Sequence, residues 1–447
     1  MNSRRTLIAR SAIVGLSCVF GFAAAGDSPS PTRRVIPFGG QTMGTTYTVK
    51  VFADDVDADL AIEIDAELRS VNDQMSTYLK SSEISRFNAS ESTDWFNVSR
   101  EFANVVDQSL VISRKTDGAF DVTIGPLIDA WNFGAKPRTT TPPDESALDS
   151  LSDSYGYEKL SVRLDPPALR KSTPQLRIDL SAIAKGHGVD RVTELLNEHG
   201  YVDSFVEIGG EVRVSGSKGG QPWRVGIQKP DAAATAPMYA LALGADDRRD
   251  DASMATSGDY RNYFESDGVR YSHTIDPRTR KPITHPLASV SVTASDCQTA
   301  DAWATALNVL GRDEGFAIAE REGLNAFFIV RSKSGWDTAA TGSLTSLTAD
   351  PGKLRTAPTG QPPRTASSLI PLFAITAALL GLVIVGMAVG VIFGRNSISG
   401  SCGGIASIED ADGNVSCSLC SNPADACKDL RRRMGVQPQK VTATVDE

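Results

Sequence analysis

Long runs of Lys and Arg are missing from this sequence of 447 residues, whose formal net charge is −9. Nucleic-acid binding needs clustered positive charge to neutralise phosphates, so we expect no nucleic-acid partner. Gly and Pro, with 38 and 23 residues, show no collagen-like or low-complexity excess, and a hydrophobic share of 41% excludes a wholly disordered chain. The composition therefore predicts a folded protein with a substantial core.

Cysteine is almost absent from the middle of the chain, where Cys297 stands alone. A disulfide framework would spread its cysteines through the fold, so we expect the middle of the chain to be built without bridges. Cys18 lies in the first segment of the chain, and the other four cysteines crowd its C-terminal end, at Cys402, Cys417, Cys420 and Cys427.

The first 25 residues predict a signal peptide. Arg4 and Arg5 precede an apolar run that ends in Ala-Ala-Ala-Gly at 23–26, the order of a charged region, an apolar region and a cleavage site. The paired arginines fit both a twin-arginine signal and an ordinary one. The signal predicts export of the domain that follows, over 26–343, and a Thr-, Pro- and Gly-rich linker over 344–367.

Residues 368–394 contain no charged side chain and exceed the roughly 20 residues needed to cross a bilayer. They predict one transmembrane helix. Together with the signal, it places the 26–343 domain in the periplasm, the helix in the inner membrane and the tail, 395–447, in the cytoplasm.

The exported domain mixes two hydrophobic periods, which predicts an α+β or irregular α/β fold. Helical spacing occurs at 58–75 and 182–199. Alternation typical of strands occurs at 47–51, 204–208, 211–215 and 223–227.

Asp301 and Thr305 lie four residues apart in a helix expected to begin near Thr299. This spacing puts the carboxylate and the hydroxyl on one helix face, where two hard oxygens suit Mg²⁺. A helix-terminal Asp and a packed Thr would give the same spacing, so both interpretations stay open on the residues alone.

Two further clusters are candidates for ligand binding. Asp179 is expected to close a strand, and Lys185 follows near a helix start where anions are favoured; a capping Asp and a solvated lysine would also fit. Small residues and an aromatic at 117–127 suit either a flat ring or plain packing. His273 is expected at a strand end before a turn, where a catalytic or a structural histidine can stand.

In this order, these segments resemble the ApbE family of FAD:protein FMN transferases over about residues 36–335. The resemblance is carried by Gln-Thr-Met-Gly-Thr at 41–45, Ser-Gly-Asp-Tyr at 257–260, His-Thr-Ile-Asp-Pro at 273–277 and Asp-Ala-Trp-Ala-Thr at 301–305, with further matches at 75–78, 82–88, 117–127, 179–188 and 207–211.

The resemblance implies an enzyme that cleaves FAD, joins FMN to a Thr or Ser hydroxyl of a target protein and releases AMP. It implies FAD contacts at Met43, Tyr78, Ala119, Phe120, Asp121, Asp179, Lys185 and Ile275. It implies Mg²⁺ ligands at Asp301, at Thr305 and at the backbone carbonyl of Ala182, and His273 as the base that takes the proton of the target hydroxyl. Two alternatives are an FAD pyrophosphatase that gives FMN to water and a flavin-binding membrane scaffold without catalysis.

The tail carries four thiols, Cys402, Cys417, Cys420 and Cys427, in a compartment expected to be reducing. A soft metal, zinc or iron, explains this density better than disulfides do. Residues 370–435 resemble NqrM, a maturation protein of the sodium-pumping NADH:quinone reductase, which implies an iron-related role. The two resemblances together suggest a subunit of that reductase as the flavin acceptor.

Overall fold

A computed structural model describes residues 33–134, 140–230, 237–243, 252–260, 262–266 and 268–348, together with 408–409 and 415–416. The predicted signal peptide, the predicted span at 368–394 and the four cysteines of the tail lie outside the described residues. Within the described ranges, no helix is both long and apolar enough to cross a membrane. The chain divides into two units, 1–357 and 358–447.

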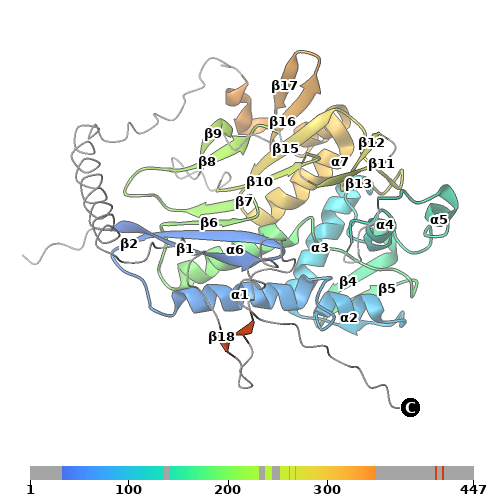
Figure 1. Cartoon of the computed structure of the whole chain (residues 1–447), viewed down its shortest axis with the longest axis horizontal. Helices are drawn as coiled ribbons and strands as arrows, with labels where there is room; N and C mark the ends of the chain where they lie inside the picture. The colour runs from blue at the N-terminus through green and yellow to red at the C-terminus, as the bar shows by residue number, and fades with distance from the viewer. Residues whose placement is uncertain are drawn as a thin grey trace, which may run out of the picture. The chain divides into compact units, whose positions relative to one another are not determined.

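An antiparallel sheet of eight strands forms the centre of the first unit (Figure 1). Its order is β1-β2-β6-β7-β10-β15-β16-β17. The strands are β1 Arg34–Thr42, β2 Thr45–Ala53, β6 Ser204–Ile208, β7 Glu211–Ser215, β10 Ser253–Gly258, β15 Leu287–Ala294, β16 Asn325–Ser332 and β17 Gly335–Ala340.

The hairpin between β6 and β7 places a tight turn at the end of these strands nearest the site described below. Gly209 and Gly210 form this turn with φ angles of 63° and 111°. Both lie in the left-handed region, which glycine adopts without the steric cost of a Cβ atom. The turn therefore fixes where β7 begins, at Glu211.

Helices cover one face of the sheet. These helices are α1 Leu60–Met75, α6 Ala184–Glu198 and α7 Cys297–Arg321. Buried side chains of α1 and α6 pack on those of β2 and β6 in one apolar cluster. The other face is covered by the hairpin of β8 Trp223–Gln228 and β9 Pro237–Leu243, which lies across the sheet from α6 in Figure 1.

Helix α7 is buried on almost every side over its first half, where alanines alternate with larger residues. The side chain of Asp296 caps it by accepting the N–H of Thr299 at 2.8 Å. Gly311, with φ 78° and ψ −175°, interrupts the helix in a conformation essentially limited to glycine. The first half of α7 is thus a separate straight segment that begins at its cap and ends at Gly311.

The remaining elements surround the helical side and the sheet ends. The helices are α2 Glu83–Ala89, α3 Arg100–Lys115, α4 Gly125–Ala130, α5 Glu145–Asp149, and the short 3-10 helices η1 Tyr157–Lys159 and η4 Gly342–Leu347. The strands are β3 Phe96–Asn97, β4 Leu160–Leu164, β5 Pro167–Lys171, β11 Tyr263–Ser266, β12 Val269–Ser272, β13 Ile275–Asp276 and β14 Lys281–Pro282, and, in the second unit, β18 Ile408–Glu409 and β19 Val415–Ser416.

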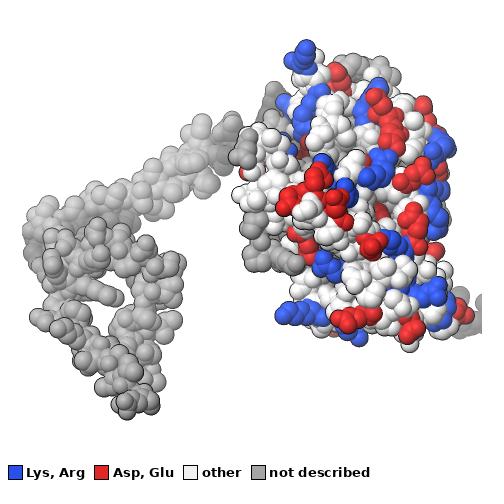
Figure 2. All heavy atoms as spheres, turned by 90° about the vertical axis from the view of Figure 1, so that its right-hand side faces the viewer, with Lys and Arg blue, Asp and Glu red and all other residues white. Residues whose placement is uncertain are grey.

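The face of the molecule on the α5 side carries opposite charges interspersed over its surface (Figure 2). Arg280 pairs there with Asp149 of α5 at 2.6 Å, and Arg278 pairs with Glu314 at 2.8 Å. Such exposed pairs each contribute at most about 1 kcal/mol. The positive and negative side chains on this face therefore largely neutralise each other.

The predicted α+β class is confirmed, and the strands predicted at 204–208 and 211–215 have exactly those bounds. The prediction that Asp179 closes a strand is wrong. The side chain of Asn88 forms two hydrogen bonds, both of 2.8 Å, with the N–H and the carbonyl of Ile178, and thereby takes the place of a neighbouring strand. Only an isolated bridge joins Arg177 to Ile124 in this described segment.

Candidate active site

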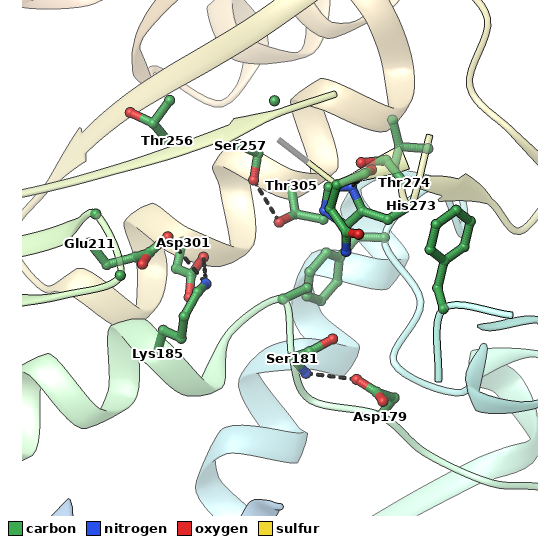
Figure 3. A pocket seen from close by; sticks show the side chains of 18 of the residues that line it. Asp179, Ser181, Lys185, Glu211, Thr256, Ser257, His273, Thr274, Asp301 and Thr305 are labelled. Carbon is green, nitrogen blue, oxygen red and sulfur yellow. Dashed lines mark hydrogen bonds and ion pairs between the residues drawn. The ribbon is translucent and has the colours of Figure 1, made fainter. Parts of the chain in front are cut away.

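A cavity of about 650 Å³ opens beside the β6–β7 turn, between the start of α6, the first half of α7 and the segment 119–134. Figure 3 shows its labelled side chains converging from α6, α7, the β7 strand and the strands of the 250–275 region. The cavity collects these predicted site residues: Tyr78, Ala119, Phe120, Asp121, Asp179, Ala182, Lys185, His273, Ile275, Asp301 and Thr305.

Two buried carboxylates and one half-buried ammonium group meet in the lining of the cavity. The Nζ of Lys185, on the first turn of α6, lies 3.1 Å from Oε1 of Glu211 and 3.7 Å from Oδ1 of Asp301 (Figure 3). Burial by itself would lower the pKa of Lys185, but the two carboxylates outweigh it and raise that pKa above its ordinary value. The lysine therefore stays an ammonium ion.

Glu211 is 4% exposed, and burial raises its pKa to about 7 against the opposing attraction of Lys185. Its Oε1 accepts from Lys185, while its Oε2 has no hydrogen-bond partner among the described residues. A buried carboxylate oxygen without a donor costs free energy. The cavity thus holds one polar atom that the chain itself leaves unsatisfied.

Asp301 and Thr305 face the cavity from the same side of α7, as their spacing predicts. Asp301 is 2% exposed, which excludes the interpretation of a solvated Asp at a helix end. Its Oδ2 accepts the backbone N–H of Gly186 at 3.0 Å, and the hydroxyl of Thr305 lies 2.9 Å from that of Ser257. Two oxygens of α7 are held in fixed positions.

The residues fit a magnesium ion. An α-helix would pair the N–H of Gly186 with the carbonyl of Ala182, but that N–H points to Asp301. The Ala182 carbonyl consequently accepts no hydrogen bond within the described part of the chain. A carboxylate, a hydroxyl and an open carbonyl are hard oxygen donors of the kind Mg²⁺ takes. Clusters of three or more His, Cys, Asp or Glu, as a transition metal would favour, are absent from the described ranges.

His273 follows β12 and lines the cavity near Thr274 and Thr305 (Figure 3). Its Nδ1 lies 3.0 Å from the carbonyl oxygen of Asn262. A carbonyl only accepts, so this contact assigns the proton to Nδ1 and, in the neutral ring, leaves the lone pair on Nε2. The histidine is therefore in the tautomer that a base requires.

The segment 119–134 forms the wall at the other end of the cavity. Ala119 and Phe120 are buried, Tyr78 is 70% exposed, and Ile275 is buried in the adjoining apolar cluster. Asp121 accepts from the N–H and hydroxyl of Thr123, both at 2.7 Å, and from the N–H of Tyr157 at 2.9 Å. Burial raises its pKa to about 6. Asp121 thus shapes this wall through bonds within the chain.

Asp179 accepts the N–H of Ser181 at 2.8 Å, which orders the loop that leads to Ala182. Met43 does not line the cavity in the described structure. It has a φ of 49° and packs partly buried between two apolar clusters, against Gly188 of α6. The FAD contact of Met43 stays a prediction.

The sequence interpretation missed Glu211 and Ser257 as site residues. Both lie in segments that carry the family resemblance, and both line the cavity. The sequence did offer one signal for Glu211. It is a charged residue directly after a Gly-Gly turn, it begins a strand, and the residue that follows it is buried. Ser257 offered no such signal, since its contact with Thr305 depends on how β10 packs against α7.

Opposite charges and a histidine that line one cavity of ligand size are typical of an enzyme active site. Comparison with known proteins gives its class. The model of the ApbE family matches residues 43–328, and a second model, (Na+)-NQR maturation NqrM, matches residues 391–436.

The sequence matches to curated relatives extend over most of this chain and of each relative. The FAD:protein FMN transferase of Vibrio cholerae is 43% identical over 312 residues, covering 69% of this chain and 91% of that protein. The protein of the same name from Haemophilus influenzae is 37% identical over 346 residues, covering 76% and 97%.

Solved structures agree with these relatives. Flavin Transferase ApbE from Vibrio cholerae matches with a TM-score of 0.63 at 39% identity and covers 70% of this chain and 99% of that one. The apo form of flavinyl transferase ApbE from Pseudomonas stutzeri matches with a TM-score of 0.63 at 36% identity, covering 70% and 97%. The chain belongs to the ApbE family and is an enzyme of the transferase class, with an NqrM-type segment at its C-terminal end.

Proposed function

We propose that this protein transfers FMN from FAD to a Ser or Thr hydroxyl of another protein and releases AMP, in a reaction that depends on Mg²⁺. The observation that carries the proposal is the cluster of Lys185, Asp301 and Glu211 in the same cavity as His273. Relatives named FAD:protein FMN transferase, at 35–43% identity, support the same reaction.

In the proposed reaction, the hydroxyl oxygen of the acceptor attacks the FMN phosphorus while the bond to the AMP phosphate breaks. The proton of the hydroxyl goes to Nε2 of His273, and AMP leaves with the bridging oxygen. Lys185 places a fixed positive charge beside the diphosphate. Phosphoryl transfer depends more on such positioning and charge neutralisation than on covalent chemistry.

Asp301, Thr305 and the Ala182 carbonyl would hold Mg²⁺. When bound, Mg²⁺ would neutralise part of the negative charge that develops on the phosphate oxygens. Gly186 supports this role, because its N–H fixes one oxygen of Asp301 at 3.0 Å and leaves the other facing the cavity centre.

The acceptor we propose is a subunit of the Na⁺-translocating NADH:quinone reductase. The match of residues 391–436 to an NQR maturation family supports this choice, because one chain then carries both activities for one client. We further propose that Cys402, Cys417, Cys420 and Cys427 bind iron on the cytoplasmic side, and that the enzyme domain is periplasmic and tethered to the inner membrane by 368–394.

The test is to co-express the full chain with the candidate reductase subunits and to examine denatured protein for flavin fluorescence in the gel. Fluorescence that stays on an acceptor subunit, and disappears when its target Thr is replaced by Ala, is the expected result. Release of FMN and AMP with no flavin left on protein would instead identify an FAD pyrophosphatase and would reject the proposed transfer.

A further inference from the structure

Glu211 stands at the start of β7, and its carboxylate lies next to that of Asp301, near the ammonium group of Lys185 (Figure 3). Its Oε1 is within hydrogen-bond distance of Lys185 Nζ, at 3.1 Å, whereas Oδ1 of Asp301 is 3.7 Å away. The hydrogen bond of the ammonium therefore goes to Glu211. Asp301 is attracted by the positive charge of Lys185 but forms no hydrogen bond with it.

This difference matters for a cation. If the ammonium closed on Asp301, it would occupy the carboxylate oxygen that faces the cavity. With Lys185 held by Glu211, that oxygen has no hydrogen bond, since the only one to Asp301 in the described part of the chain goes from Gly186 to Oδ2. Glu211 thus keeps a coordinating oxygen available.

The charges lead to the same conclusion. When both carboxylates are ionised, Glu211, Asp301 and Lys185 carry one net negative charge at the centre of a mostly buried site. Without the charge of Glu211, Asp301 and Lys185 would form a neutral pair. A net negative centre attracts a divalent cation, and a closed neutral pair does not.

Buried polar side-chain atoms of folded proteins are usually hydrogen-bonded. Glu211 uses one carboxylate oxygen in this way, and its buried Oε2 has no partner among the described residues. The cost of that unsatisfied oxygen indicates that the position of Glu211 serves the cavity rather than the stability of β7.

We propose that Glu211 is a positioning residue that holds Lys185 away from Asp301 and thereby sets the affinity of the Asp301–Thr305 site for a divalent cation. This inference rests on the magnesium site of the proposed function. Glu211 acts through Lys185 and needs no contact with the cation itself.

The size of the effect follows from the distances. In Glu211→Gln, the neutral amide oxygen holds the ammonium less strongly than the carboxylate does, so the ammonium can move from 3.7 Å to about 2.8 Å from Asp301, the length of a charge-assisted hydrogen bond. At an effective dielectric constant of about 20, this stronger attraction corresponds to about a tenfold change in an equilibrium constant. We therefore expect about tenfold weaker cation binding.

The experiment measures Mn²⁺ binding to the full chain by the loss of the free-ion EPR signal, with Mg²⁺ as competitor and without FAD. The variants are Glu211→Gln, Lys185→Met and the double variant. Glu67→Gln is the matched control, because Glu67 pairs with Arg191 of α6 at 2.7 Å and does not line the cavity. Thermal unfolding is recorded for each.

We expect about tenfold weaker Mn²⁺ binding in Glu211→Gln, wild-type affinity in Glu67→Gln and affinity at least equal to wild type in Lys185→Met. In the Lys185→Met background there is no ammonium group for Glu211 to hold away from Asp301, so Glu211→Gln should change little there.

Unchanged affinity in Glu211→Gln, or the same tenfold loss in both backgrounds, would overturn the inference. If Glu211→Gln fails to fold, Lys185→Met still decides, since weaker binding in that variant would contradict a lysine that competes for Asp301. A wild-type chain that binds no Mn²⁺ would reject the metal site of the proposed function, which is a different failure.

Discussion

Replacing Asp301 by Asn tests the proposed chemistry with little change of shape. The amide keeps an oxygen for the N–H of Gly186 but loses the charge that faces Lys185 and the proposed cation. Lys185 retains Glu211 as its partner at 3.1 Å. We therefore expect Asp301→Asn to fold and to lose flavin transfer.

The structure gives the scale of both effects. At 3.7 Å and an effective dielectric constant of about 20, Asp301 attracts Lys185 by about 4–5 kcal/mol. The cost of burying the carboxylate, also several kcal/mol, opposes this attraction. We expect the free energy of unfolding to fall by less than about 2 kcal/mol. Loss of a metal ligand removes several kcal/mol of transition-state stabilisation, or about a 10³-fold loss of rate.

The assay incubates purified full chain with FAD, Mg²⁺ and an acceptor bearing the target hydroxyl, then quantifies covalent flavin by in-gel fluorescence. Urea unfolding gives the stability. Asp296→Ala is the control on the same helix, because it removes a cap worth about 1 kcal/mol outside the cavity and should leave transfer intact. Transfer by Asp301→Asn within tenfold of wild type would refute the reasoning.

Three further outcomes are expected. His273→Ala should lower the transfer rate by about 10²–10⁴-fold and leave the Kd for FAD unchanged in a fluorescence titration; a loss of FAD affinity would make His273 a binding residue. The folded state raises the pKa of Asp121 from 3.8 to about 6, so its contribution to stability is complete below pH 3.8 and is lost as the pH rises through 6. Asp121→Asn should remove about 2 kcal/mol of this pH dependence in urea unfolding between pH 4 and pH 7, and an unaltered dependence would count against it. Gly186→Ala places a Cβ 2.3 Å from the carbonyl oxygen of Cys297 and should lower the free energy of unfolding by about 3 kcal/mol, which an unchanged Tm would contradict.

Local patterns in the sequence were sufficient to predict several elements of the fold. The helix predicted at 182–199 is α6, Ala184–Glu198, because apolar residues repeat at helical spacing, and the hairpin of β6 and β7 follows from alternation around Gly209 and Gly210. The spacing of Asp301 and Thr305 likewise fixed their common face. These features depend on neighbours within a few residues.

The rest of the site depends on contacts that no local pattern encodes. Lys185, Glu211 and Asp301 come from α6, β7 and α7, and only the packing of these elements makes one cluster of them. Asn88 replaces a strand partner for Ile178 from 90 residues away, which is why the strand expected before Asp179 does not form. Such contacts are tertiary and need the structure.

The break at Gly311 has a mechanical consequence for the enzyme. Upstream of it, the stretch with Asp301 and Thr305 is anchored by the Asp296 cap and by its close approach to Gly186. Downstream, the last turns of α7 are joined to that stretch through a single glycine rather than through a continuous backbone ladder. We therefore expect substitutions within 312–321 to change the Tm more than they change the positions of Asp301 and Thr305.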